Sequence, residues 1–143
     1  MDDGFLFDEQ AANKAVKFFR LFLRHVKGEK SGTPFVLLPW QEHEVIRPLF
    51  GWKRLDGSRR YRRAYIEIPR KNGKSTLCAG IGLLLLFADD EAGAEIYSAA
   101  ADREQAAIVF DVARSMVQEE PDLARQAQVF RRSIVVPRTR SVY

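Results

Sequence analysis

The sequence predicts an α/β fold in which a partial parallel sheet is flanked by helices and preceded by an N-terminal helix. Two runs of β-prone residues, 63–68 and 94–100, are each followed by a helical pattern. Successive strand and helix units of this kind place their strands parallel, with right-handed crossovers. The helix between the two runs, Lys74 to Phe87, is apolar nearly all round, which is typical of a helix buried in an α/β interior.

The first 33 residues are predicted to form a helical segment. Apolar residues recur at spacings of three and four from Asp8 to about Val26, and Asp8 is suited to be the N-cap. Residues 27–34 are expected to form a loop because of their Gly, Ser and Pro content. The apolar stripe comprises Ala12, Ala15, Val16, Phe19, Phe22, Leu23 and Val26.

Between this segment and the first predicted strand, three shorter elements are expected. Residues 35–38 form a short extended run, and Gln41 to Phe50 has the pattern of a helix. Residues 51–60 are polar and contain glycine, so we expect a turn region there.

The last third of the chain is predicted to contain one more helix and one more strand. Asp102 with Gln105 resembles a capping box, and the helix that follows should stop near Pro121. Its apolar face comprises Ala106, Val109, Phe110, Ala113 and Met116. The final strand is expected around 133–136.

The composition indicates one ordinary globular domain with an uneven distribution of positive charge. The chain has 143 residues, of which 46% are apolar and 29% charged, and its formal net charge is +4. Six cations stand against the single Asp56 in one stretch, and the chain from residue 125 onward has five arginines and no acid. Either a polyanionic partner such as nucleic acid or a solvated surface accounts for them. They are Lys53, Arg54, Arg59, Arg60, Arg62 and Arg63, then Arg125, Arg131, Arg132, Arg138 and Arg140.

Several features indicate an intracellular protein. Cys78 is the only cysteine, so no internal disulfide can form, and its apolar surroundings predict a buried, inert thiol. The apolar stretch from Leu77 to Ala88 is shorter than the roughly 20 residues that cross a bilayer. The acidic N-terminus does not resemble a secretion signal.

The stretch Ile66 to Thr76, with the sequence I-E-I-P-R-K-N-G-K-S-T, has the layout of a phosphate-binding loop. Unsatisfied N–H groups at the start of the following helix and the helix dipole together attract a phosphate. Lys74 adds a full charge, and Ser75 offers a hydroxyl to phosphate-bound Mg²⁺. The first glycine of the usual pattern is replaced by Ile68. A glycine that merely ends a strand beside a surface lysine is the structural alternative.

Three motifs in order carry a family resemblance. P-R-K-N-G-K-S-T follows a predicted strand, P-W-Q lies about thirty residues upstream, and S-A-A-A-D-R-E-Q-A-A lies downstream. Together they resemble the ATPase domain of the large terminase subunit of tailed bacteriophages, over roughly residues 34–120. The resemblance implies a P-loop NTPase of the ASCE type that uses ATP and Mg²⁺, and it makes the missing first glycine an expected feature.

The resemblance also assigns roles to individual residues. Arg70 matches the arginine proposed to reach the γ-phosphate, and Gln41 of P-W-Q matches the glutamine that recognises adenine. Arg70 and Lys74 are thus the implied catalytic residues and Ser75 the implied metal ligand. The implied nucleotide-binding set is Gln41, Pro69, Arg70, Lys71, Asn72, Gly73, Lys74, Ser75 and Thr76.

The residues themselves are consistent with these roles but leave alternatives open. Arginine binds two phosphate oxygens through its planar fork, and phosphoryl transfer requires such cationic stabilisation. Arg70 and Lys71 nevertheless also suit an ordinary surface. An ordinary glutamine at a helix start would account for Gln41, and Trp40 is expected in the core.

The resemblance implies a motor that packages double-stranded viral DNA into procapsids in the cytoplasm of a bacterial host. Its implied partners are DNA, the portal protein, the small terminase subunit and further copies of the chain, with no membrane. Residues 34–143 would be the N-terminal portion of the ATPase domain, truncated before Walker B and the nuclease domain. This fragment is therefore expected to bind ATP without hydrolysing it efficiently.

One run imitates the missing Walker B motif and is rejected. An apolar run begins at Leu83 and is followed by Asp89, Asp90 and Glu91. The run follows Lys74 so closely that it must belong to the helix that begins there. His25 and His43 lie too far apart to suggest a metal site. The alternative functions are a non-enzymatic nucleic-acid-binding fragment and a fragment of another P-loop ATPase such as a helicase.

Overall fold

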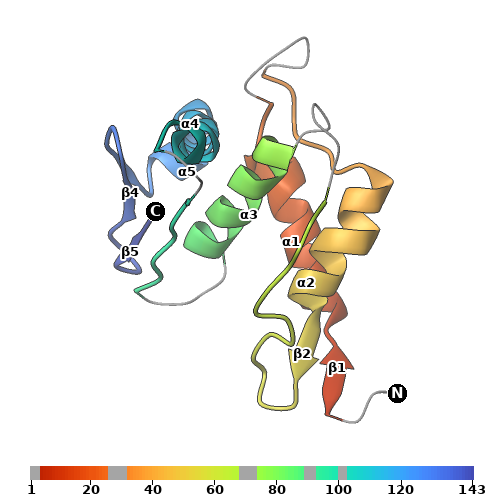
Figure 1. Ribbon diagram of the computed structural model, residues 1–143. Coiled ribbons are helices and arrows are strands. Elements are labelled where there is room, and N and C mark those ends of the chain that lie inside the picture. Colours follow the sequence, from red (N-terminus) through yellow and green to blue (C-terminus); the bar gives the residue numbers. More distant parts are fainter. Residues whose placement is uncertain (1–3, 26–31, 68–73, 89–92, 100–102) are drawn as a thin grey trace.

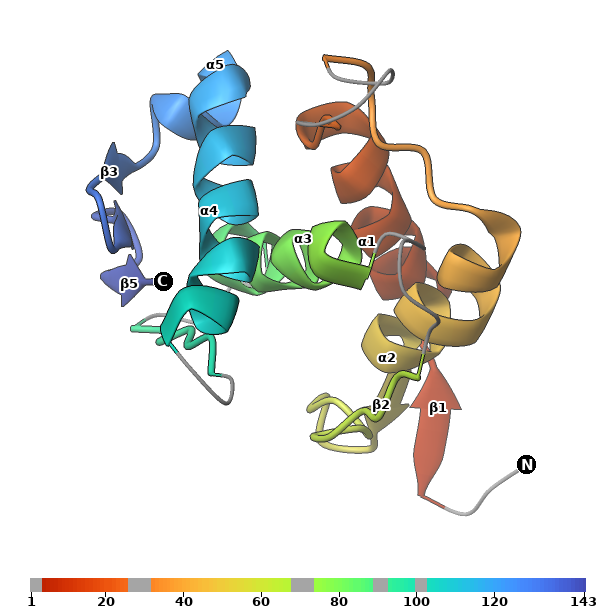
Figure 2. The same cartoon turned by 45° about the horizontal axis from the view of Figure 1, so that its top comes forward.

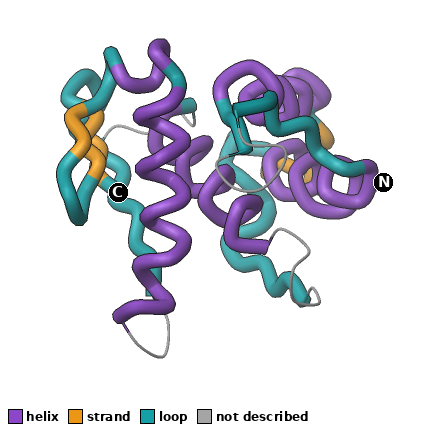
Figure 3. Tube along the Cα trace, turned by 90° about the horizontal axis from the view of Figure 1, so that it is seen from above, coloured by secondary structure: helices purple, strands orange, loops and turns teal. Residues whose placement is uncertain are grey.

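Helix α3, Lys74–Phe87, lies between two groups of elements in the computed structural model (Figure 1). The structure describes residues 4–25, 32–67, 74–88, 93–99 and 103–143. One group is N-terminal and includes helices α1, Glu9–Phe22, and α2, Arg47–Gly51, whereas the other is C-terminal and includes helix α4, Arg103–Glu119. Seen from above, the two groups remain on opposite sides (Figure 3). The described residues thus have mixed helix and strand content, with α3 in contact with both groups.

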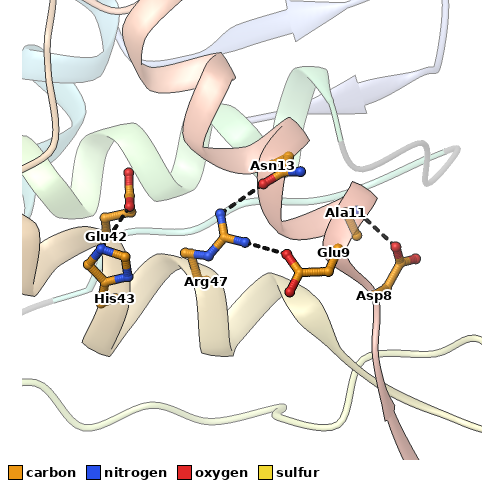
Figure 4. Close-up of polar contacts among 7 residues, drawn as sticks. All are labelled: Asp8, Glu9, Ala11, Asn13, Glu42, His43 and Arg47. Carbon is orange, nitrogen blue, oxygen red and sulfur yellow. Dashed lines mark hydrogen bonds and ion pairs between the residues drawn. The ribbon is translucent and has the colours of Figure 1, made fainter.

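Helix α1, Glu9–Phe22, confirms the predicted N-terminal helix. Asp8 is its N-cap, because its Oδ1 accepts a hydrogen bond from the Ala11 N–H at 3.0 Å (Figure 4). The helix ends at Leu23, which is extended, and Val26 lies outside the described residues. The predicted periodic stripe is buried through Ala12, Ala15, Phe19 and Leu23, together with Phe18.

A two-stranded antiparallel sheet that the sequence did not predict lies beside α1. Strand β1, Phe5–Phe7, pairs with strand β2, Trp52–Arg54, so the expected turn region 51–60 begins with a strand. The rings of Phe7 and Trp52 meet edge to face, with centroids 5.3 Å apart. At Gly51 a Cβ would come within 2.5 Å of the Phe7 ring, so the sheet packs against this glycine.

The helix predicted from Gln41 is present in two parts. It begins as a π-helix, η1, Gln41–Ile46, and continues as α2, Arg47–Gly51. Arg47 ties α2 to α1, since its guanidinium donates to the Asn13 Oδ1 at 2.9 Å and to the Glu9 carboxylate at 2.7 Å (Figure 4). No strand forms over residues 35–38.

The C-terminal group contains helix α4, Arg103–Glu119, and the short helix α5, Pro121–Ala124. Helix α4 confirms the predicted helix and runs across α3 (Figure 2). Asp102 and the Gln105 side chain of the expected capping box lie outside the described residues. The buried Glu120 carboxylate accepts from the Asp122 N–H at 3.3 Å and pairs with Arg24 at 3.2 Å. This ion pair joins the C-terminal group to the N-terminal one.

A small antiparallel sheet completes the C-terminal group. It consists of β3, Gln128–Val129, β4, Ile134–Val136, and β5, Ser141–Val142. Strand β4 confirms the strand expected around 133–136. The run predicted as a strand from Ala94 forms only one parallel bridge, between Glu95 and Val142. Two backbone bonds accompany this bridge, from the Ile96 N–H to Val142 at 2.8 Å and from the Val142 N–H to Ala94 at 2.9 Å.

The described residues do not contain the predicted parallel sheet. Residues 63–67, expected to form the strand before the phosphate loop, are assigned to no strand, and Ile68 lies outside the described residues. Tyr65 is 89% exposed. A strand exists only where a neighbour completes its ladder of hydrogen bonds, and no described strand pairs with this segment. The β-prone composition therefore predicted a local tendency and not a paired strand.

Glycines allow α3 to pack closely against both groups. A Cβ at Gly80 would lie 2.4 Å from the Phe19 ring of α1, and one at Gly82 would lie 2.7 Å from the Tyr143 ring. The core surrounds this helix and extends into both groups. Its largest fully buried members are Phe19, Leu23, Ile46, Leu77, Leu83, Leu84, Met116, Val117, Ile134 and Val136.

Candidate nucleotide site at the start of helix α3

The first turn of α3 carries the described part of the predicted phosphate loop. The helix begins at Lys74, whose side chain is exposed, and Ser75 and Thr76 are half-buried in its first turn. The first N–H groups of a helix have no intrahelical acceptor, and the helix dipole places partial positive charge there. Both effects attract an anion to the end of the helix that presents the Lys74 ammonium.

The remaining predicted loop residues precede the described first turn of α3. Ile68 and the implied ligands Pro69, Arg70, Lys71, Asn72 and Gly73 lie outside the described residues. The segment that leads to them, residues 61–67, runs alongside α2 toward the start of α3 (Figure 1). The described segment before the loop and the first turn of α3 after it therefore lie in the same N-terminal half of the structure.

Helix α3 also decides the nature of the run that imitates a Walker B strand. Residues Leu83 to Phe87 form the last turns of α3 and are helical. This confirms the expectation that the run belongs to the same helix as Lys74. The acids at 89–91 that follow it lie outside the described residues.

Gln41, the implied adenine ligand, has a structural role. Its side chain is only 3% exposed, and its Oε1 accepts the Leu38 N–H at 2.9 Å. A glutamine that reaches back three residues to the start of its own helix is one half of a capping box. The amide nitrogen carries the donors that remain for a base, because the oxygen already caps the helix. Gln41 also begins the π-helix, a form that recurs at functional sites.

Trp40 lies at a hollow that the sequence did not reveal. The tryptophan was expected in the core, and it is half-buried, packs against the core and lines an open hollow of about 450 Å³. Helix residues Glu44, Val45, Pro48 and Leu49 form one wall, and the segment 63–67 forms the other. The hollow therefore lies between the P-W-Q helix and the segment that leads to the phosphate loop. Its walls are distant in sequence, so the motif spacing gave no sign of it.

Cys78 lies one turn into α3 and is half-buried, not fully buried as expected, but its chemistry still fits a structural thiol. Burial raises the pKa of Cys78 above its ordinary value, and the nearby Lys74 charge opposes this only in part. A raised pKa leaves little reactive thiolate near neutral pH.

The described histidines and acids form no metal site. His25 stacks on Phe35 with ring centroids 4.8 Å apart. No group of three or more His, Cys, Asp or Glu side chains within the described residues is suited to hold a metal.

The family described as "Terminase large subunit, ATPase domain" matches residues 39–143. The chain belongs to this family. The matched range contains the P-W-Q motif, the Gly-Lys-Ser-Thr turn and helices α3 and α4. An ATPase domain acts on nucleotide, so membership is consistent with a nucleotide site at the start of α3.

Individual relatives agree with this membership of the large terminase family. The "Terminase, large subunit" of Enterobacteria phage HK97 is 34% identical over 111 residues, which cover 77% of this chain and 21% of that protein. The crystal structure of the HK97 bacteriophage large terminase superposes with a TM-score of 0.76 at 28% identity, over 92% of this chain and 26% of that one. The chain thus spans about a quarter of the length of these terminases. In the described residues of the present chain, no helix is long and apolar enough to cross a membrane.

Proposed function

We propose that this chain is the ATP-binding part of a phage large terminase subunit, the motor that packages double-stranded DNA into procapsids in the host cytoplasm. The observation that carries the proposal is the family match over 39–143, in which Gly-Lys-Ser-Thr opens a long buried helix. Residues 34–143 are proposed as the N-terminal portion of the ATPase domain and 1–33 as an N-terminal helical segment. Packaging, the portal protein, the small terminase subunit and self-association are proposed for the whole protein.

The proposed nucleotide site combines backbone and side-chain donors. The first N–H groups of α3 and the Lys74 ammonium hold the β- and γ-phosphates, and residues 69–73 of the implied nucleotide-binding set complete the site. Arg70 stabilises the charge that develops on the γ-phosphoryl group, where a planar, permanently charged fork is effective. The Gln41 amide nitrogen donates to the adenine while its oxygen caps the helix.

The described donors fit a metal–nucleotide complex better than a free metal. Among the described residues, the hydroxyl of Ser75 is the implied metal ligand, and no cluster of acids accompanies it. Mg²⁺ keeps several waters and binds through few protein groups plus substrate phosphates. Mg²⁺ bound to ATP supplies charge neutralisation at the phosphates, and Ser75 would hold it there.

Efficient turnover by the 143-residue chain itself is not expected. Hydrolysis in this class requires a strand that ends in acids to hold Mg²⁺ and orient water. In the described residues β4 is followed by Pro137, and the run before Asp89 is helical. We therefore propose binding of ATP·Mg²⁺ with negligible steady-state hydrolysis.

Calorimetric titration of ATP·Mg²⁺ into wild-type protein and Lys74→Ala tests this proposal. The variant should lose affinity by about tenfold or more, since one charge-assisted contact contributes roughly 1.5 to 3 kcal/mol. The matched control is Lys17→Ala, which removes an exposed lysine from α1 and should bind like wild type. Equal affinity of all three proteins would refute a phosphate site at Lys74. Rapid turnover that Lys74→Ala abolishes would refute only the expected absence of hydrolysis.

A further inference from the structure

A dense run of positive charge lies on β2 and on the polypeptide that follows it. We call this surface the arginine face. A short loop returns residues 58–60 to β2: the Arg54 N–H donates to the Ser58 carbonyl at 2.8 Å, and the Arg60 N–H donates to the Trp52 carbonyl at 3.0 Å. Gly57, with φ of +89°, closes the turn. The face comprises Lys53, Arg54, Arg59, Arg60, Arg62 and Arg63.

Aromatic rings hold part of this face in place. The Arg60 guanidinium lies over the Phe5 ring at 4.2 Å, over Tyr61 at 5.2 Å and over Trp52 at 5.5 Å. Arg59 lies over Phe50 at 5.9 Å. Cation–π contacts orient a guanidinium without neutralising its charge. A solvated rim would not require such ordering, whereas a binding surface benefits because less side-chain entropy is lost on association.

The acid nearest this face is already engaged in the turn. The Asp56 Oδ1 accepts from the Ser58 N–H at 2.9 Å and from the Ser58 hydroxyl at 2.6 Å. These bonds, assisted by the charges of Arg54 and Arg62, hold the pKa of Asp56 below its ordinary value. Lys53, Arg54, Arg62 and Arg63 form no ion pair with any acid among the described residues. Arg54, Arg62 and Arg63 are also exposed, so their charge is accessible to a partner.

We infer that the arginine face is a contact surface for the phosphate backbone of double-stranded DNA, and this inference rests on the proposed function. Guanidinium groups bind phosphate oxygens through two parallel hydrogen bonds, and a row of such groups along one segment suits a polymer of evenly spaced phosphates. The contacts are made to backbone phosphates, so they position the duplex and carry no sequence information. Arg59, Arg62 and Arg63 line a hollow together with Ile81 and Leu85, which belong to later turns of α3 than Lys74.

The second basic region of the chain provides a matched control. Arg131, Arg132 and Arg138 are exposed cations at the turns of the β3–β5 sheet, on the opposite side of α3. The triple variant Arg54→Gln, Arg62→Gln, Arg63→Gln and the triple variant Arg131→Gln, Arg132→Gln, Arg138→Gln remove the same charge. All six side chains are exposed, so both proteins should melt like wild type.

The test measures fluorescence anisotropy of a short mixed-sequence DNA duplex over a series of salt concentrations. Each lost phosphate contact lowers the slope of log affinity against log salt by about 0.9, so the arginine-face triple should lower it by roughly 2 to 3 and weaken binding about tenfold or more at ~0.1 M salt. The control triple should change both quantities clearly less. Equal effects of the two triples, or no effect of either, would overturn the inference.

Two further readouts separate the inference from its alternatives. A polyglutamate peptide that binds the arginine face more tightly than DNA at equal salt would replace the nucleic acid by an acidic protein partner. ATP·Mg²⁺ titration of the double variant Arg54→Gln, Arg62→Gln, which keeps Arg63 in the wall of the hollow beside Trp40, should match wild type. If Lys74→Ala weakens ATP binding but the arginine-face triple binds DNA like wild type, the proposed function stands and this inference fails.

Discussion

Replacing Gly80 by alanine should destabilise the protein although alanine is the better helix former. Gly80 lies in the interior of α3, where alanine gains about 1 kcal/mol over glycine in an exposed helix. Its added Cβ would lie 2.4 Å from Cε1 and 2.9 Å from Cζ of Phe19. The Phe19 ring is fully buried and packs edge to face on Phe35, so it cannot swing into solvent. Overpacking of this kind costs roughly 1 to 3 kcal/mol, and the net loss should be about 1 to 2 kcal/mol.

A double-mutant cycle with Phe19→Leu isolates the clash. Leucine lacks the ring atoms that the new methyl group meets, so Gly80→Ala should cost less in the Phe19→Leu background, with a coupling of about 1 kcal/mol or more. Gly82→Ala is the matched control, because its Cβ meets the Tyr143 ring at 2.7 Å and not Phe19. It should be destabilising and additive with Phe19→Leu.

Urea denaturation followed by circular dichroism measures the free energy of unfolding of each variant. The slope with denaturant should stay constant across the set, so that midpoints report stability. A Gly80→Ala protein as stable as wild type, or one whose cost is unchanged in the Phe19→Leu background, would refute the close packing of α3 on α1.

Three further predictions address single contacts. Gln41→Glu keeps an acceptor for the Leu38 N–H but loses the amide donor, so it should weaken ATP binding and leave the melting temperature nearly unchanged. Gln41→Ala should lower both the ATP affinity and the melting temperature. Unchanged ATP affinity in both variants would make Gln41 only a helix cap. Arg24→Ala leaves the buried Glu120 carboxylate without its cation, so it should lower the free energy of unfolding in urea by roughly 1 to 3 kcal/mol. If Arg24→Ala costs less in a Glu120→Gln background, the unpaired charge is the cause, and an equal cost in both backgrounds would contradict this. Burial raises the pKa of Cys78, so iodoacetamide should alkylate it more slowly than a free thiol at neutral pH. The alkylation rate should rise with pH until the pH exceeds the raised pKa. Alkylation as fast as that of glutathione would contradict the burial.

The helices could be predicted because their signals are local. Asp8 and the spacing of apolar residues after it define α1, and the uninterrupted apolar run after Lys74 defines α3. The pairing of β1 with β2 could not be predicted, since Phe5 and Arg54 are far apart in sequence and each strand has three residues. The segment 63–67 shows the opposite error. Its β-prone residues were sufficient for a prediction, but a strand also requires a partner, which the described residues do not provide.

The candidate site was predictable to a similar degree. The sequence placed Lys74 and Ser75 at a helix start, and the structure agrees. For Gln41 it left two interpretations, an adenine ligand and an ordinary glutamine at a helix start. The bond to Leu38 shows that the Gln41 side chain caps the helix, and the base contact stays a proposal. The stacking of Arg60 on Phe5 depends on the β1–β2 pairing and was equally hidden.

The two glycines of α3 also set the direction in which its lysine points. Gly80 and Gly82 are two residues apart, or about 200° around the helix, so Phe19 and Tyr143 pack closely against nearly opposite sides of α3. With both sides packed in this way, α3 cannot rotate about its axis without a clash on one side. Lys74 begins the same rigid helix roughly 9 Å from Gly80 along the axis. The direction in which Lys74, the proposed phosphate-binding residue, leaves the helix is therefore set by packing in the core, and core substitutions that leave the protein folded can still change it.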